Sequence, residues 1–326
     1  MAEKLLEIQG LKTHFRTKAG IAKAVDGVDL NILKGEVIGL VGESGSGKSV
    51  TALSILRLIP NPPGEIVAGS IIYKGQDLLE LSWEEIRKIR GNEISMVFQE
   101  PMTSLNPVFT IGMQLMEIIL EHEKCSRKQA FDRSVQMLEL VGIPEPASQM
   151  ETYPQHFSGG MRQRVMIAIA LACNPSLLIA DEPTTALDVT IQAQILELMF
   201  QIKEQRKDAA ILLITHNLGV VAETCDRVAV MYGGKMQEIG SSEEIFNNPQ
   251  HPYTRGLLAS LPQVEGEKQD RLRTIPGNIP NIHKLPIGCK FATRCEEKLE
   301  RCDLIEPDFH QVALGHRSRC HLVESP

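Results

Sequence analysis

The sequence predicts an α/β fold with a largely parallel sheet, followed by a smaller C-terminal segment of different character. Three observations carry this prediction. Short apolar segments alternate with helical patterns through the first 240 residues, a glycine-rich turn joins one such segment to a helical pattern, and proline and cysteine accumulate near the end. Alternation of this kind is typical of parallel sheets covered by helices.

The predicted strands and helices of the first part follow in order along the chain. EVIGLVG at 36–42 is apolar, β-branched and bounded by glycine, which suits a strand buried on both faces. SLLIADEP at 176–183 and AAILLITHN at 209–217 have the same character. Helical patterns lie between them, VTALSILRLI at 50–59 and TIQAQILELMFQIKEQ at 190–205.

Three further segments complete the predicted organisation. The stretch from about 120 to 172 is mainly helical and forms an insert, so we place a helical subdomain at about 100–172. VAVMYGGKMQEIG at 228–240 predicts two short strands joined by a Gly-Gly turn, a hairpin signal. Because proline and turn residues multiply beyond it, we predict a first domain over 1–250 and an extension over 251–326.

Composition and charge exclude several classes of protein. The net charge of −7 offers no basic surface for wrapping nucleic acid. No uninterrupted apolar run is long enough to span a bilayer, and the start MAEKLLEIQG lacks the layout of a signal peptide. We therefore expect a reducing, cytosolic location without disulfides, in which Cys125, Cys173 and Cys225 are ordinary thiols.

A phosphate-binding loop is predicted where the first apolar strand meets a helix. The segment GLVGESGSGKS fits G-x-x-x-x-G-K-[ST] and supplies Gly42, Glu43, Ser44, Gly45, Ser46, Gly47, Lys48 and Ser49, followed by Val50. Glycines let successive N–H groups point at one anion, and the helix directs its positive end to the same place. Lys48 can reach the β- and γ-phosphates, and Ser49 can offer its hydroxyl to Mg²⁺. The alternative is a plain glycine-rich turn between strand and helix.

Two adjacent acids follow another predicted strand. Asp181 and Glu182 lie just past the apolar segment LLIA, at the carboxyl end where ligands bind in open α/β sheets. Asp181 can hold the Mg²⁺ shell, and Glu182 can orient or deprotonate an attacking water. Alone, such a pair of acids could lie in a solvated loop. Together with the glycine-rich loop, the pair predicts hydrolysis of a nucleoside triphosphate.

One further motif narrows the class. FSGGMRQR at 157–164 places Ser158, Gly159 and Gly160 at a helix start, which makes a second anion site. This motif resembles the signature of ABC-type ATPases, and the resemblance extends in fixed order from about residue 5 to residue 245. Gln99 in MVFQEPMTSLNP resembles the Q-loop glutamine, a further Mg²⁺ ligand; Asp188 in ALD resembles the D-loop; and His216 in LLITHN resembles the switch histidine.

Two positions depart from the commonest pattern of that family, and one assignment stays open. Met161 stands where glutamine is commoner in the signature, which leaves the Ser158 hydroxyl and the glycine N–H groups in place. Val50 stands where a hydroxyl residue is commoner, yet its N–H can still contact phosphate. Phe15 lies where the family places an aromatic that stacks on adenine, and it could equally be a core residue.

The resemblance implies a fold and a mechanism. The expected fold is a P-loop ABC-type nucleotide-binding domain with a RecA-like core, an antiparallel β subdomain and a helical subdomain. ATP and Mg²⁺ are expected between two such chains, with Lys48, Glu182 and His216 as the catalytic residues. The segments QEPMTSLNP, SGGMRQR and NPQHPYTRGLLASLP resemble the ATPase subunits of dipeptide and oligopeptide permeases most, with nickel permeases close behind.

That subfamily implies partners and a place in the cell. The expected partners are integral membrane permease subunits, a second ATPase subunit that is identical or paralogous, and, indirectly, a substrate-binding protein. Nucleic acid is not an expected partner. The chain would lie peripherally on the cytoplasmic face of the cell membrane. The competing functions are a soluble ABC-type ATPase acting on ribosomes or DNA, and a regulatory or metal-sensing module whose C-terminal tail is the functional part.

The tail carries four cysteines, Cys289, Cys295, Cys302 and Cys320, with wide and uneven spacing. Four thiolates can hold zinc or an iron–sulfur cluster, and structural zinc usually shows tighter C-x₂₋₄-C pairs. Unmetallated thiols are a third possibility, and His283, His310 or His316 could replace one ligand. Similar tails in peptide-permease ATPases carry a [4Fe–4S] cluster, so the resemblance favours that group, in a structural rather than an electron-transfer role.

Overall fold

The computed structural model describes residues 3–100, 104–183, 189–260 and 275–323. Internal contacts divide the chain into two units, the first built mainly on Glu80–Ile214 and the second on Leu6–Ile32, Val37–Leu79 and Thr215–Pro326. None of the helices in the described ranges combines the length and the hydrophobicity that a membrane span requires.

The first unit combines parallel strands with a group of helices. Its strands run in the order β8-β7-β6, each parallel to its neighbour. These strands are β6 (Ile94–Val97), β7 (Leu177–Asp181) and β8 (Ala210–Ile214), and every residue in them is buried. Strands buried on both faces are apolar throughout, which is the pattern that the sequence predicts for β7 and β8.

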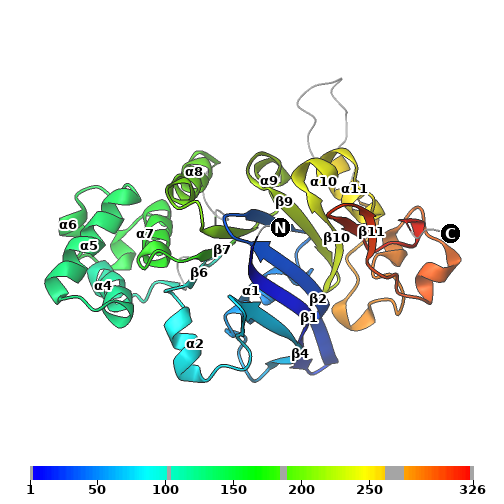
Figure 1. Cartoon of the computed structure of the whole chain (residues 1–326), viewed down its shortest axis with the longest axis horizontal. Helices are drawn as coiled ribbons and strands as arrows, with labels where there is room; N and C mark the ends of the chain where they lie inside the picture. The colour runs from blue at the N-terminus through cyan, green and yellow to red at the C-terminus, as the bar shows by residue number, and fades with distance from the viewer. Residues whose placement is uncertain (1–2, 101–103, 184–188, 261–274, 324–326) are drawn as a thin grey trace. The chain divides into compact units, whose positions relative to one another are not determined.

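The first unit has helices inside the predicted subdomain at about 100–172 and others on either side of it. They are α2 (Trp83–Ile89), α4 (Ile111–His122), α5 (Arg127–Leu140), α6 (Pro146–Gln149), α7 (Gly159–Leu171) and α8 (Val189–Gln205). The helices α4 to α7 lie together in the green part of Figure 1. Ser126 begins α5 with a capping box, and Ile119, Ala130 and Ala172 form a buried cluster.

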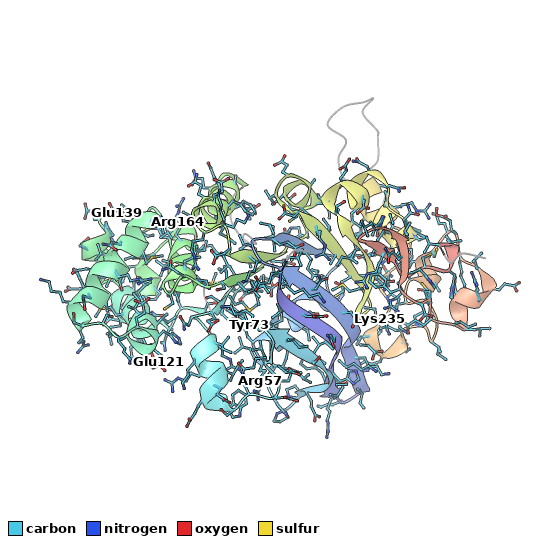
Figure 2. The ribbon with its side chains drawn as sticks, viewed as in Figure 1. Arg57, Tyr73, Glu121, Glu139, Arg164 and Lys235 are labelled. Atoms are coloured by element: carbon cyan, nitrogen blue, oxygen red, sulfur yellow. The ribbon has the colours of Figure 1, made fainter. Side chains whose placement is uncertain are left out.

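An arginine ties three segments of this unit together. Arg164 on α7, labelled in Figure 2, donates from Nη1 to the carbonyl oxygen of Val141 at 2.6 Å. Its Nη2 donates to Oε1 of Gln194 on α8 at 2.8 Å. The single guanidinium therefore holds the end of α5 and a side chain of α8 against α7.

The second unit contains two sheets. The first has the order β2-β1-β4-β5, with β1 antiparallel to β4; its strands are β1 (Lys4–Thr17), β2 (Gly20–Leu33), β4 (Gly64–Tyr73) and β5 (Gln76–Asp77). Its members alternate between buried and exposed residues, as expected for an antiparallel sheet with one solvated face. The expected antiparallel β subdomain is thus present.

The other sheet of the second unit runs β11-β12-β10-β9-β3. Its strands are β3 (Val37–Val41), β9 (Arg227–Tyr232), β10 (Lys235–Ser241), β11 (His310–Ala313) and β12 (His316–Ser318). β3 is parallel to β9, and β9 and β10 form the predicted hairpin through Gly233 and Gly234. β12 pairs antiparallel with β10, so the end of the chain continues this sheet.

Short helices and turns complete the second unit. The helices are α1 (Lys48–Ile55), α9 (Leu218–Thr224), α10 (Ser242–Asn247) and α11 (Pro252–Ala259). The extension adds the 3₁₀ turns Ile282–Lys284, Ala292–Arg294, Glu300–Asp303 and His321–Val323. Lys235, labelled in Figure 2, joins this extension to β10 by pairing with Glu306 at 2.9 Å.

A buried carboxylate anchors the extension and α11 on β10. Glu238 is fully buried and accepts hydrogen bonds from the N–H groups of Gln250 at 2.6 Å and His251 at 2.9 Å. Its Oε1 also lies 2.7 Å from Nε2 of His316 on β12. One buried carboxylate thus joins β10 to the start of α11 and to β12.

Candidate functional site

The glycine-rich loop follows β3 and ends at α1, as predicted. Three of its glycines have left-handed φ values, 148° at Gly42, 78° at Gly45 and 107° at Gly47. A Cβ atom at Gly42 would collide with the carbonyl oxygen of Met231, and one at Gly47 with that of Ala24. Positions 42 and 47 therefore require glycine for two reasons: the left-handed backbone conformation and the lack of room for a Cβ atom.

Polar groups line the inside of this loop. The ammonium of Lys48, a residue only 5% exposed, donates to the carbonyl oxygens of Gly42 at 2.8 Å and Glu43 at 3.1 Å. The Ser46 hydroxyl is buried and has no hydrogen-bond partner among the residues that the structure describes. Ser49 and Val50 occupy the first turn of α1 and are half-buried. A buried ammonium and an unsatisfied hydroxyl at a helix start fit a phosphate group.

Two other predicted residues lie in the second unit. Phe15 is half-buried on β1 opposite Gly64, and its ring lies close enough to Gly64 to exclude a Cβ atom there. His216 is exposed in the turn after β8, two residues before α9, whose first turn is capped by the side chain of Asn217. The adenine-stacking role of Phe15 and the switch role of His216 stay predictions.

The two acids lie at the carboxyl end of β7 in the first unit. Asp181 is the last residue of the strand and is 5% exposed. Glu182 has a φ of 46°, and its N–H donates to the carbonyl oxygen of Ile214 at 2.8 Å. Left-handed backbone in a residue other than glycine costs energy and is concentrated at functional sites. Gln99, which follows β6, donates from Nε2 to Oε2 of Glu182 at 3.1 Å, so the structure brings these two predicted residues together.

The signature motif begins α7 in the same unit. The Ser158 side chain caps the helix by accepting the N–H of Met161 at 3.3 Å, and both Ser158 and Gly159 are exposed. Gln163, which is almost fully buried in α7, donates to the carbonyl oxygen of Pro183 just after the acids. The signature helix is therefore bonded directly to the acidic segment. Asp188, the predicted D-loop residue, lies outside the described residues.

The structure brings the four tail cysteines together. Three of them, Cys289, Cys302 and Cys320, are each 7% exposed, and Cys295 is half-buried. The N–H of Cys289 donates to the carbonyl oxygen of Cys302 at 2.8 Å. Burial raises the pKa of Cys289 to about 12 and that of Cys320 to about 11, and the neighbouring cysteines of the group add to both shifts.

These cysteines do not form a single-ion site in the described residues. No group of three or more His, Cys, Asp or Glu side chains there is arranged to hold one metal ion. His316 is engaged with Glu238, and Nε2 of His283 lies 3.2 Å from the Thr17 hydroxyl. Outside the tail, Cys173 and Cys225 are buried and Cys125 is partly buried, which suits ordinary thiols.

Sequence reasoning missed two residues that contact the glycine-rich loop. Arg294 of the extension forms an ion pair with the Glu43 carboxylate, with Nη1–Oε2 and Nη2–Oε1 distances of 2.5 and 3.0 Å. The phenol oxygen of Tyr253 on α11 accepts the Glu43 N–H at 2.8 Å. Burial raises the pKa of Tyr253, so this phenol stays protonated. The partners are 251 and 210 residues apart in sequence, so no local pattern could have indicated them.

Comparison with protein families gives two matches. Residues 25–185 match the ABC transporter family, and residues 237–302 match the oligopeptide/dipeptide transporter C-terminal region. The first match contains the glycine-rich loop, Gln99, the signature and the two acids. The second contains Tyr253, Arg294 and three of the four tail cysteines.

Solved structures share the fold over about three quarters of the chain. The dimeric ATP-binding cassette MJ0796 in a post-hydrolysis state, bound to ADP and Pi, is 26% identical, with a TM-score of 0.65 over 73% of this chain and 98% of that one. The cbiO1 protein of Clostridium perfringens is 24% identical, with a TM-score of 0.62 over 76% of this chain and 92% of that one. The predicted α/β fold of an ABC-type nucleotide-binding domain is thereby confirmed.

Curated relatives match over almost the whole chain. The oligopeptide transport ATP-binding protein AppD of Bacillus subtilis is 52% identical over 98% of this chain and 97% of its own length. The dipeptide transport ATP-binding protein DppD of the same organism is 51% identical over 99% and 96%. Identity at this level over both regions shows that the chain belongs to the family of ABC transporter ATP-binding subunits that serve oligopeptide and dipeptide transport.

Proposed function

We propose that the chain is the ATP-hydrolysing motor subunit of a membrane peptide importer and binds Mg²⁺–ATP at the Gly42–Ser49 loop. The nucleotide assignment depends on the loop itself, in which glycines with left-handed φ values come directly before the first turn of α1. This geometry directs N–H groups and the positive end of a helix at one anion. The names of the full-length relatives, which are peptide transport proteins, support the peptide cargo over nickel.

The chemistry follows from the residue types. Lys48 would bind the β- and γ-phosphates, while Ser49, Asp181 and Gln99 would hold the Mg²⁺ shell. Glu182 would orient the attacking water and accept its proton. The hydrogen bond of 3.1 Å from Gln99 to Glu182 supports this assignment, because the proposed Mg²⁺ ligand and the proposed base are in direct contact.

Completion of the site requires a second chain. The Ser158–Gly160 segment, exposed at Ser158 and Gly159, would contact the γ-phosphate of an ATP held by the partner's loop, and His216 would steady the same phosphate. The dimeric MJ0796 cassette supports this arrangement. Binding of two nucleotides would close the pair and hydrolysis would open it, which shifts a two-state equilibrium in the membrane partner.

The remaining assignments concern the surroundings of the motor. We expect integral membrane permease subunits, a second ATPase subunit that is identical or paralogous, and a substrate-binding protein that acts through the permease. The chain would sit peripherally on the cytoplasmic face of the membrane. The match of residues 237–302 to a peptide-transporter C-terminal region supports the division into a cassette over 1–250 and an extension over 251–326.

Substitution of the proposed base tests the motor. Glu182→Gln should bind ATP with wild-type affinity and lose at least 100-fold in turnover, because the amide cannot accept the proton of the water. Glu197→Gln is a matched control, because Glu197 is an exposed residue of α8 whose carboxylate accepts a hydrogen bond from the side chain of Gln201. Both variants are assayed with the permease subunits in proteoliposomes. Wild-type turnover in Glu182→Gln would refute the assigned role.

The cargo is tested in the same vesicles. A peptide importer should show ATPase stimulation by a substrate-binding protein loaded with a dipeptide or an oligopeptide. Stimulation by Ni²⁺ alone would identify the nickel alternative. ATP hydrolysis that is indifferent to the permease would favour the soluble ATPase instead.

We propose further that Cys289, Cys295, Cys302 and Cys320 hold a [4Fe–4S] cluster with a structural role. The convergence of the four thiols on one buried place supports this. When bound, the group would cross-link an extension that has little apolar core of its own.

Metal analysis tests this second proposal. Protein purified without oxygen should contain about four irons and four sulfides per chain, and Cys302→Ser should lose most of both. Cys225→Ser, which removes a buried thiol outside the group, should keep them. Stoichiometric zinc without sulfide would overturn the assignment.

A further inference from the structure

A charged residue of the extension is bonded to the proposed phosphate loop. Arg294 and Glu43 form a bidentate pair at 2.5 and 3.0 Å, and their side chains are only 4% and 23% exposed. Two parallel charge-assisted bonds make this one of the stronger kinds of side-chain contact. The pair links residue 294, next to the cysteine group, to the second residue of the loop.

Arg294 is held in place by its own surroundings. Its Nε donates to the carbonyl oxygen of Pro276 at 3.0 Å, and its Nη1 lies 3.4 Å from the Tyr232 hydroxyl. The guanidinium also lies 5.9 Å from the Tyr232 ring and 6.0 Å from the Phe291 ring. The side chain is therefore positioned by the extension and by β9, so it presents its charge to Glu43 at little entropic cost.

Glu43 occupies a position that an anion-binding loop would not be expected to fill with an acid. Its carbonyl oxygen accepts from the Lys48 ammonium at 3.1 Å, and its N–H donates to Tyr253. The backbone of Glu43 is thus part of the loop that holds the Lys48 ammonium in place. A bare carboxylate at this point would repel the charged phosphates of ATP.

We infer that Arg294 is a positioning residue for ATP, which neutralises the Glu43 carboxylate and fixes the loop backbone, so that the extension sets the affinity of the cassette for the triphosphate. The inference rests on the proposed binding of ATP phosphates at the Gly42–Ser49 loop. It gives the extension a direct part in nucleotide binding, in addition to any structural role of its cysteines.

A charge-rescue experiment on the full chain tests the inference. The readout is the dissociation constant of Mg²⁺–ATP, obtained by competition with a fluorescent ATP analogue. Arg294→Gln should bind ATP about tenfold more weakly, because the carboxylate is left unpaired beside the phosphates. The double variant Glu43→Gln with Arg294→Gln should return to within about twofold of wild type, because the repelling charge is gone.

Two controls separate this charge effect from general damage. Arg255→Gln removes another arginine of the same region, whose exposed partner is Glu297 at 2.9 Å, and should leave ATP affinity unchanged. Added salt should reduce the defect of Arg294→Gln, because it screens a partly exposed carboxylate. A merely structural defect would show neither rescue by Glu43→Gln nor this salt dependence.

Each outcome decides the inference. Unchanged ATP affinity in Arg294→Gln would overturn it, and so would a double variant that binds as weakly as Arg294→Gln. Lys48→Ala tests the proposed function separately from the role of Arg294. This variant must lose ATP binding if the loop holds the phosphates. Wild-type affinity in Lys48→Ala would sink the loop assignment itself.

Discussion

Replacement of the buried Glu238 by glutamine should destabilise the second unit markedly. The carboxylate accepts the N–H groups of Gln250 and His251 at 2.6 and 2.9 Å and lies 2.7 Å from Nε2 of His316. Hydrogen bonds to a charged group contribute about 1.5–3 kcal/mol each. Glu238→Gln keeps an oxygen as acceptor on one side but turns an NH₂ group toward an N–H donor on the other. We expect a loss of about 3 kcal/mol.

The assay is thermal unfolding of the full chain, followed by circular dichroism. A loss of this size corresponds to about 8 °C in the midpoint of a unit of about 150–250 residues. Glu223→Gln is the matched control, because Glu223 is an exposed acid on α9 of the same unit and should shift the midpoint by no more than about 1 °C. A Glu238→Gln midpoint within 1 °C or so of wild type would refute the account of this carboxylate as an anchor.

Two further predictions concern a buried histidine and the phosphate loop. Burial is the main cause that lowers the pKa of His251 from 6.5 to about 3, and the charge of Arg255 adds to this shift. Between these values the unfolded chain binds the extra proton, so stability should fall as the pH drops below about 6.5. His251→Asn keeps a side-chain cap for α11 without the titration, and its midpoint should depend less steeply on pH; equal slopes would contradict this. In the loop, Gly47→Ala should weaken ATP binding at least tenfold, because the new Cβ atom would collide with the Ala24 carbonyl oxygen. Gly45→Ala is the control: its Cβ atom meets nothing within 4 Å, so its ATP affinity, measured by the same titration, should fall less. Equal affinities of the two variants would show that space around Gly47 is not limiting.

The parts of the fold that sequence predicts well are those with a strong local pattern. β3, β7 and β8 are apolar on both faces, and the Gly233-Gly234 turn marks the hairpin, so the predicted bounds of each lie within about three residues of the observed ones. Within the subdomain predicted at about 100–172, α4 begins at Ile111 behind a Thr110 cap, whereas the helical pattern itself was recognised only from about 120. The alternating burial of β1 was likewise visible in the sequence without being used.

The parts that could not be predicted depend on contacts between distant segments. The motifs around Lys48, Glu182 and Ser158 are local, since each is a short turn beside one strand or helix. Arg294 has no local signal, because its partner Glu43 is 251 residues away and neither residue is unusual in its own neighbourhood. The anchoring role of Glu238 is equally invisible, since an acid in a short strand is normally expected to face solvent.

The pairing of β12 with β10 has a consequence for how the protein can be shortened. Ser318 and Arg317 lie opposite Glu238 and Ile239, so the last strands of the chain occupy hydrogen-bonding groups along β10. A fragment trimmed to the cassette would leave that backbone uncovered beside apolar side chains, and bare strands of this kind recruit other molecules into aggregates. Preparations of the isolated cassette should therefore precipitate more readily than the intact polypeptide, whatever nucleotide is supplied.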